Sequence, residues 1–131
     1  AAMMLACLWP VFGKDLPADL VKNALSISGL HDLEPIMHTP FLKNLCLDDA
    51  QVRQVSPALL PAPARGVLAA VAGGDESAEF HRQAELIRKA WGKRSVPICE
   101  TLPGLNHFSV LEALIQPGHR MNRIAMDLLQ K

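Results

Sequence analysis

The feature that most constrains the fold is a continuous apolar run, Gly66–Ala72, followed at once by an amphipathic pattern over Ser77–Trp91. A strand-length run without a polar face is typical of a parallel strand covered on both sides. The segment after it carries one apolar stripe at helical spacing, formed by Phe80, Ala84, Ile87 and Trp91. Shorter apolar runs of strand character lie at Ala24–Ile27 and Val96–Glu100. Strands alternating with helices predict an α/β fold with about three parallel strands and flanking helices.

The remaining chain predicts shorter elements and one further helix. Helical turns are expected over Leu33–Met37 and Asp48–Val55, the second capped by Asp48. Three prolines in Ser56–Arg65 make a regular element unfavourable there. Gly92 is expected to end the central helix. Apolar residues at helical spacing predict a C-terminal helix, and they are Met121, Ile124, Ala125 and Leu128.

The first nine residues, Ala1–Trp9, are all apolar. Ala, Met and Leu favour helix, and a helix that is apolar on every side must be buried on every side. No helix-capping residue precedes the segment, and it lacks the charged leading region of a signal peptide. We therefore expect a buried helix and a chain that begins inside a larger fold.

Composition narrows the class of protein. Thirteen basic and thirteen acidic residues balance, which argues against a broad nucleic-acid-binding or anionic-membrane surface. No apolar run reaches the roughly 20 residues that span a bilayer. Three cysteines without CxxC spacing, Cys7, Cys46 and Cys99, predict reduced, structurally buried thiols rather than a disulfide framework. These features predict a cytoplasmic protein without nucleic-acid or membrane partners.

Acidic residues and a histidine follow two neighbouring predicted strands. Asp75 and Glu76 come after the pair Gly73–Gly74, and His107 comes after the turn at Pro103–Gly104. A right-handed crossover places consecutive parallel strands side by side, and functional groups collect beyond their carboxyl ends. An acid that orients a histidine is the base-activating half of a hydrolytic triad. The residues alone leave open which of the two acids contacts His107.

The other histidines predict no site. His31, His38 and His119 lie in polar, proline-flanked stretches, and His81 falls on the solvent side of the central helix pattern. His31, Asp32 and His38 share neither a helical face nor a tight turn. We therefore expect no metal site and no metal cofactor.

Four segments in order carry a resemblance to a known family. They are SISGLHDLEPI (26–36), the Ser56–Pro57 pair, GGDESAEFHRQ (73–83) and LPGLNHFSVLEAL (102–114). Together they resemble the C-terminal half of α/β-hydrolase esterases, most closely the kynurenine formamidase (arylformamidase) branch. The resemblance covers essentially the whole chain, and the acid-loop segment with its EFHRQ continuation is its most specific part.

The resemblance implies catalytic roles for two residues. His107 matches the family's catalytic histidine, and Glu76 matches its catalytic acid, with Asp75 as the competitor because the family more often uses aspartate. The nucleophile is expected upstream, since no GxSxG motif occurs in the 131 residues. Ser26 and Ser28 precede Gly29 but lack the leading glycine. The expectation is one partial α/β-hydrolase domain over residues 1–131 that starts shortly after the catalytic serine.

The function implied by the resemblance is hydrolysis of an aryl formamide, N-formylkynurenine, through an acid–histidine–serine triad and without a cofactor. The alternatives are a general carboxylesterase or lipase-like enzyme, and a non-catalytic fragment or association module. Phe41, Leu42 and Leu45 lie where the family places pocket elements and are candidates for apolar substrate contacts, with burial in the fold as the competing interpretation. The expected partners are a small-molecule substrate and the missing N-terminal half of the fold, with a homo-oligomer left open.

Overall fold

In the computed structural model, the described residues are Ala2, Leu5, Asp15, Pro17 and 20–130. The helix expected over Ala1–Trp9 therefore lies almost wholly outside the described residues. At positions 41–43 only the backbone is described.

The centre of the molecule is a three-stranded sheet in the order β1-β2-β3. Its strands are β1 (Ala24–Ile27), β2 (Leu68–Gly73) and β3 (Ile98–Leu102), and both pairings are parallel. The sheet register sets Ile27 opposite Val71 and Gly73 opposite Leu102. The carboxyl ends of all three strands thus lie at one edge of the sheet. The predicted α/β fold with three parallel strands is confirmed.

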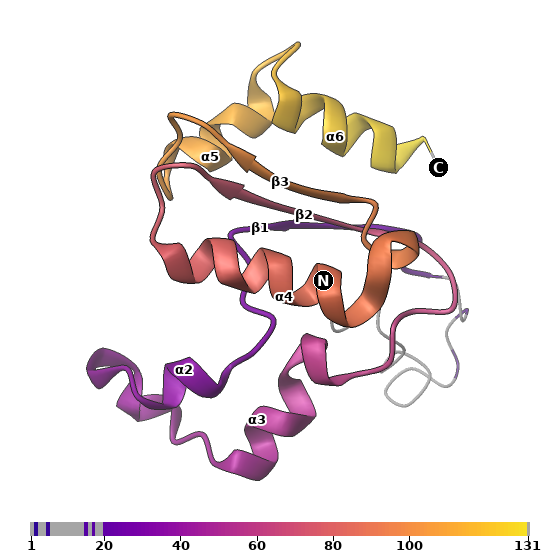
Figure 1. Ribbon diagram of the computed structural model, residues 1–131. Coiled ribbons are helices and arrows are strands. Elements are labelled where there is room, and N and C mark those ends of the chain that lie inside the picture. The colour runs from indigo at the N-terminus through magenta and orange to yellow at the C-terminus, as the bar shows by residue number, and fades with distance from the viewer. Residues whose placement is uncertain (1, 3–4, 6–14, 16, 18–19, 131) are drawn as a thin grey trace.

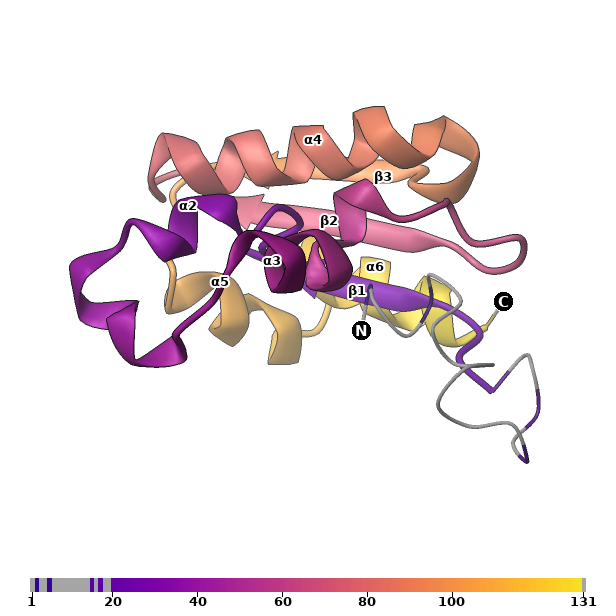
Figure 2. The ribbon, with the colours of Figure 1, turned by 90° about the horizontal axis from the view of Figure 1, so that it is seen from below.

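Helices cover both faces of this sheet (Figures 1 and 2). Helix α4 (Ala78–Ser95) lies on one face, and α5 (Ser109–Glu112), η4 (Ala113–Ile115) and α6 (Arg120–Leu129) lie on the other. The central strand β2 is buried along its whole length and packs against the helices on both faces of the sheet. Its side chains alternate, so Leu68 and Ala70 pack with α4 while Ala69 and Val71 pack with α5 and α6.

The long helix α4 follows the predicted stripe but runs beyond its predicted end. Ala84, Ile87 and Trp91 are buried, as the helical spacing predicts. Gly92 has non-helical φ and ψ values of 76° and 166°, so the regular helix ends there as predicted, and a second short helical stretch beyond this kink carries α4 to Ser95. Strand β3 consequently begins at Ile98, two residues later than predicted.

The segment between β1 and β2 forms short helical elements that lie beside the α4 layer in Figure 1. They are α2 (Glu34–Met37), η2 (Pro40–Leu45), α3 (Asp49–Val55) and η3 (Pro57–Leu59). Asp48 caps α3 as predicted, through a reciprocal capping box with Gln51. The proline-rich stretch contains only the single 3₁₀ turn of η3.

The predicted burial of the cysteines holds in part for one of the two that the structure describes. Cys99 is half-buried in β3, but Cys46, just after η2, is exposed, so the prediction is wrong for Cys46. Its backbone has a φ of 47°, which turns the chain out of η2. Cys7 lies outside the described residues. Within the described part of the chain, no helix combines the length and apolar character needed to cross a membrane.

Candidate functional site

Two turns beyond the carboxyl ends of β2 and β3 lie side by side and form the candidate site. Their backbones are joined by hydrogen bonds from Gly74 N to Leu102 O (2.7 Å) and from Asp75 N to Leu105 O (3.0 Å). Gly73 permits this approach, because a Cβ atom there would lie 2.2 Å from the Leu105 carbonyl oxygen. The glycines are therefore needed for close packing of the two turns.

Glu76 and His107 meet across these turns. The imidazole Nδ1 lies 2.5 Å from Glu76 Oε1. The glutamate side chain is fully buried, whereas the imidazole is 53 % exposed. Asp75, the competing acid, is exposed and binds the neighbouring turn through its backbone. The structure thus brings Glu76 to His107, while the catalytic role of either residue stays a prediction.

The Glu76 carboxylate has partners from three parts of the chain. His107 binds one oxygen, Oε1, while the Ser28 hydroxyl and the Gly73 amide each donate to Oε2 at 2.6 Å. Burial alone raises the pKa of Glu76, but hydrogen bonds from Ser28, His107 and Gly73 outweigh it and hold the pKa below its ordinary value. Glu76 is therefore a buried, ionised carboxylate at neutral pH.

The His107 ring is positioned on several sides. Because the ionised carboxylate can only accept, Nδ1 carries the donated proton. Phe80 stacks on the imidazole with ring centroids 4.9 Å apart, and Phe108 meets it edge-on at 5.9 Å. The Asn106 side chain accepts hydrogen bonds from the amides of Phe108 and Ser109, which fixes the turn around His107. The opposite nitrogen, Nε2, has no hydrogen-bond partner among the described residues and is a proton acceptor in the neutral ring.

Residue spacing predicts no role in the site for three of these supporting residues, Ser28, Phe80 and Asn106. It places Phe80 in the apolar stripe of the central helix and gives Ser28 only as a serine without the nucleophile motif. Their positions carried a partial signal, because Ser28 follows the strand next to β2 and Phe80 begins the helix after the acid. Contacts from different strands to one carboxylate are set by the sheet register, which residue spacing alone does not define.

His31 is where the structure most clearly differs from the sequence interpretation. It was predicted in a polar loop, yet only 2 % of its surface is exposed. Its Nε2 lies 3.2 Å from the Ser26 hydroxyl, and Gly29 makes room, since a Cβ there would approach that hydroxyl to 2.0 Å. Burial lowers the pKa of His31 from 6.5 to about 4, so the ring is neutral at pH 7.

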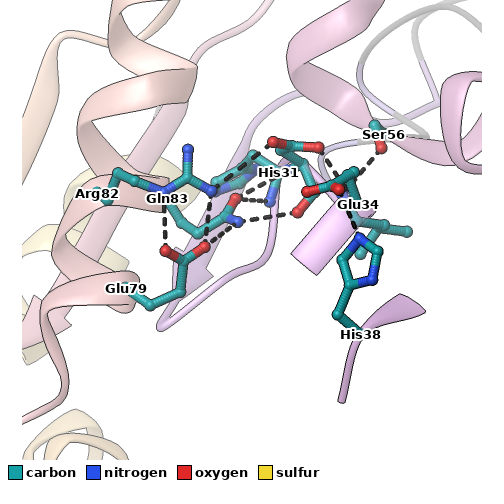
Figure 3. A network of polar contacts seen from close by, with 9 residues as sticks. His31, Glu34, His38, Ser56, Glu79, Arg82 and Gln83 are labelled. Carbon is teal, nitrogen blue, oxygen red and sulfur yellow. Dashed lines mark hydrogen bonds and ion pairs between the residues drawn. The ribbon is translucent and has the colours of Figure 1, made fainter. Parts of the chain in front are cut away.

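A polar network next to the site ties the loop after β1 to α4 (Figure 3). Buried Gln83 accepts from the amides of His31 and Asp32 at 2.7 and 2.8 Å, and its own amide donates to Asp32 O and Glu79. The Ser56 hydroxyl accepts a hydrogen bond from the amide of Leu33, in the same loop, at 3.0 Å. This network supports the chain segment that carries Ser28.

The remaining histidines have local roles. His81 donates from Nε2 to the Gly73 carbonyl at 2.9 Å, so the predicted solvated position is wrong. His38 is exposed and pairs with Glu34 at 2.7 Å, and His119 caps α6 by accepting from the Met121 amide. Among the described residues, no group of His, Cys, Asp and Glu side chains is arranged to hold a metal ion.

Of the three residues suggested for apolar substrate contacts, the structure describes the side chain of Leu45 alone. Leu45 ends η2 and is 53 % exposed, so the alternative of burial in the fold is wrong for this residue. The side chains of Phe41 and Leu42 lie outside the described part of the structure. A role in substrate binding stays a prediction for all three.

Comparison with known proteins gives distant relatives, two of which carry the same name. The whole chain aligns with a protein named kynurenine formamidase from Danio rerio, with 25% identity over 138 residues. It also aligns with a protein of the same name from Salmo salar, with 26% identity over 139 residues. The chain spans about half the length of these relatives, 46% of each. No family model matches the chain.

Proposed function

We propose that this chain supplies the acid and histidine of a serine-hydrolase triad, in a protein that hydrolyses a formamide or ester carbonyl. The observation that carries the proposal is the hydrogen bond of a buried carboxylate, Glu76, to an exposed imidazole, His107, beyond the carboxyl ends of parallel strands. Ligand-handling groups in open parallel sheets collect at this edge. The similarity to proteins named kynurenine formamidase supports an aryl formamide as the substrate.

In the proposed mechanism, His107 removes the proton of a serine hydroxyl through Nε2 while that oxygen attacks the substrate carbonyl. Glu76 keeps the proton on Nδ1 and stabilises the imidazolium as it forms. His107 then gives the proton to the leaving amine or alkoxide, and a second cycle with water releases the acyl group. Phe80 stacks on the imidazole and helps to keep the ring in this orientation.

The nucleophile of this reaction is proposed to lie outside the 131 residues. The sequence contains no GxSxG motif. Ser28, which lies near the pair, uses its hydroxyl to donate to Glu76 and does not contact His107 Nε2. We therefore expect the 131-residue chain alone to show no turnover, and a form of the protein that also carries a nucleophile elbow to be active.

The test measures hydrolysis of N-formylkynurenine and of p-nitrophenyl acetate by such an active form. Replacing His107→Ala or Glu76→Gln removes one member of a cooperative unit and should lower kcat by about 10⁴-fold. Asp75→Asn is the matched control for the acid, because it makes the same chemical change one residue away. It should keep activity near that of the parent protein.

Three outcomes would count against the proposed residue roles, and a fourth would decide between the two substrate classes. Full activity of His107→Ala would refute the assignment of the histidine. Loss of activity in Asp75→Asn with full activity in Glu76→Gln would show that Asp75, and not Glu76, is the acid of the triad. Turnover by the isolated 131-residue chain that disappears in His107→Ala would show that the nucleophile lies within it. A preference for the acetate ester over the formamide would make the protein an esterase with the same triad.

A further inference from the structure

The hydrogen bonds to Glu76 divide its two carboxylate oxygens between separate tasks. Oε1 faces His107, whereas Oε2 accepts both from the Ser28 hydroxyl and from the Gly73 amide. With Oε2 bound on two sides, the carboxylate cannot rotate without breaking both bonds. The geometry therefore fixes the direction in which Oε1 meets the imidazole.

Ser28 holds this position in an unfavourable backbone conformation. Its φ is 50°, in the left-handed region that non-glycine residues rarely occupy and that glycine adopts without penalty. Its amide still donates to Val71 O at 2.8 Å, which ties the turned residue to the neighbouring strand β2. A strained non-glycine residue retained where glycine would fit is typical of a position at which the side chain has a task.

We propose that Ser28 is a positioning residue for the Glu76–His107 pair, acting through its hydroxyl on Glu76 Oε2. This inference rests on the proposed triad. Ser28 keeps the buried carboxylate ionised and aimed, so that Glu76 holds the Nδ1 proton of His107 and leaves Nε2 to accept. Gly73 supplies a backbone donor, which every substitution except proline retains, so Ser28 is the partner of Oε2 that side-chain substitution can test.

Two substitutions separate the hydroxyl from the backbone conformation. Ser28→Ala removes the hydroxyl and keeps a Cβ at positive φ, whereas Ser28→Gly removes the hydroxyl and relieves the conformation. Ser26→Ala is the matched control, because Ser26 lies two residues earlier on β1 and contacts His31 instead of Glu76.

The first readout is the titration of Glu76 in this chain, followed by NMR of the ¹³C-labelled carboxyl group. Both Ser28 variants should raise the pKa of Glu76, because the ionised form loses a donor, and should weaken the downfield Nδ1 proton signal of His107. Ser26→Ala should leave both unchanged. In an active form of the protein, the Ser28 variants should lower kcat by about tenfold at constant KM. Losses of this size are typical when the hydrogen-bond partner that orients a metal-ligating side chain is removed.

Stability distinguishes positioning from a merely structural role. Ser28→Gly should have a higher Tm than Ser28→Ala and yet the same defects in Glu76 titration and kcat. Defects that follow Tm instead of the missing hydroxyl would overturn the inference, and so would an unchanged Glu76 titration in both variants. A changed titration together with full activity of His107→Ala would instead refute the proposed function and leave the role of Ser28 toward Glu76 intact.

Discussion

Burial of His31 makes the stability of the fold sensitive to mild acid. The ring is 2 % exposed, and its Nδ1 has no hydrogen-bond partner among the residues that the structure describes. Protonation would place a charge in this position, which is why burial lowers the pKa of His31 from 6.5 to about 4. Between these values the unfolded chain binds a proton that the folded chain does not. Stability is therefore fully present above about pH 6.5 and declines as the pH falls toward 4.

The size of this effect follows from the two pKa values. With an unfolded pKa of 6.5 and a folded pKa of about 4, linkage gives a loss of about 2 kcal/mol between pH 7 and pH 5. Three carboxylates, Glu76, Glu79 and Glu100, have lowered pKa values as well. Their contribution is lost below their ordinary range near 4.5, so the interval from pH 5 to pH 7 isolates the histidine.

The assay is urea denaturation at several pH values between 5 and 7. For a slope of about 2 kcal/mol per M, the midpoint of the wild-type chain should fall by about 1 M across this interval. His31→Gln removes the titrating group and should remove most of that fall. His38→Gln makes the same change at an exposed histidine and should keep the wild-type dependence. A His31→Gln variant with an unchanged pH dependence would refute the reasoning.

Two further predictions concern residues that hold the site in place. Gln83→Ala leaves the amides of His31 and Asp32 without their acceptor. It should lower the free energy of unfolding, measured by urea denaturation, by about 2–6 kcal/mol, since each unpaired buried group costs about 1–3 kcal/mol. The matched control is Gln54→Ala at an exposed position of α3, which should change the free energy of unfolding by less than about 0.5 kcal/mol. Equal losses of stability in the two variants would contradict the role of Gln83. Gly73→Ala forces a Cβ against Leu105 O and should abolish the downfield Nδ1 proton signal of His107. Gly118→Ala is the control, because a Cβ there meets nothing within 4 Å, and it should retain that signal. A Nδ1 proton signal that persists in Gly73→Ala would contradict the close packing of the turns.

The sheet and its helices were predictable because their apolar patterns are local. The burial of β2 on both faces was visible in an unbroken apolar run, and the stripe of α4 followed from spacing alone. The cap at Asp48 was visible for the same reason, since a capping box involves residues only three apart. The short helical stretch from Gly92 to Ser95 was not, because it follows a local stop signal and carries no apolar pattern of its own.

The candidate site was predictable as a neighbourhood but not as a set of contacts. Strand order placed the acids and His107 at one edge, yet the choice of Glu76 over Asp75 as the partner of His107 depends on how the turn after Gly73 points two adjacent side chains. The burial of His31 had no local signal, because it results from a loop held by Gln83, a residue 52 positions away. Ser28 escaped prediction for a similar reason, since its partner Glu76 lies 48 positions away.

The Glu76 carboxylate accepts hydrogen bonds from residues near the carboxyl ends of all three strands. Its donors are Ser28 after β1, Gly73 at the end of β2 and His107 beyond β3. The parallel register brings these strand ends to one level, so the site is complete only when both pairings are in register. A slip of one residue in β1 would turn its side chains to the opposite face and remove the Ser28 hydroxyl from Oε2. The full set of donors to Glu76 therefore depends on the register of the sheet, and the titration of Glu76 reports on the pairing of β1 with β2.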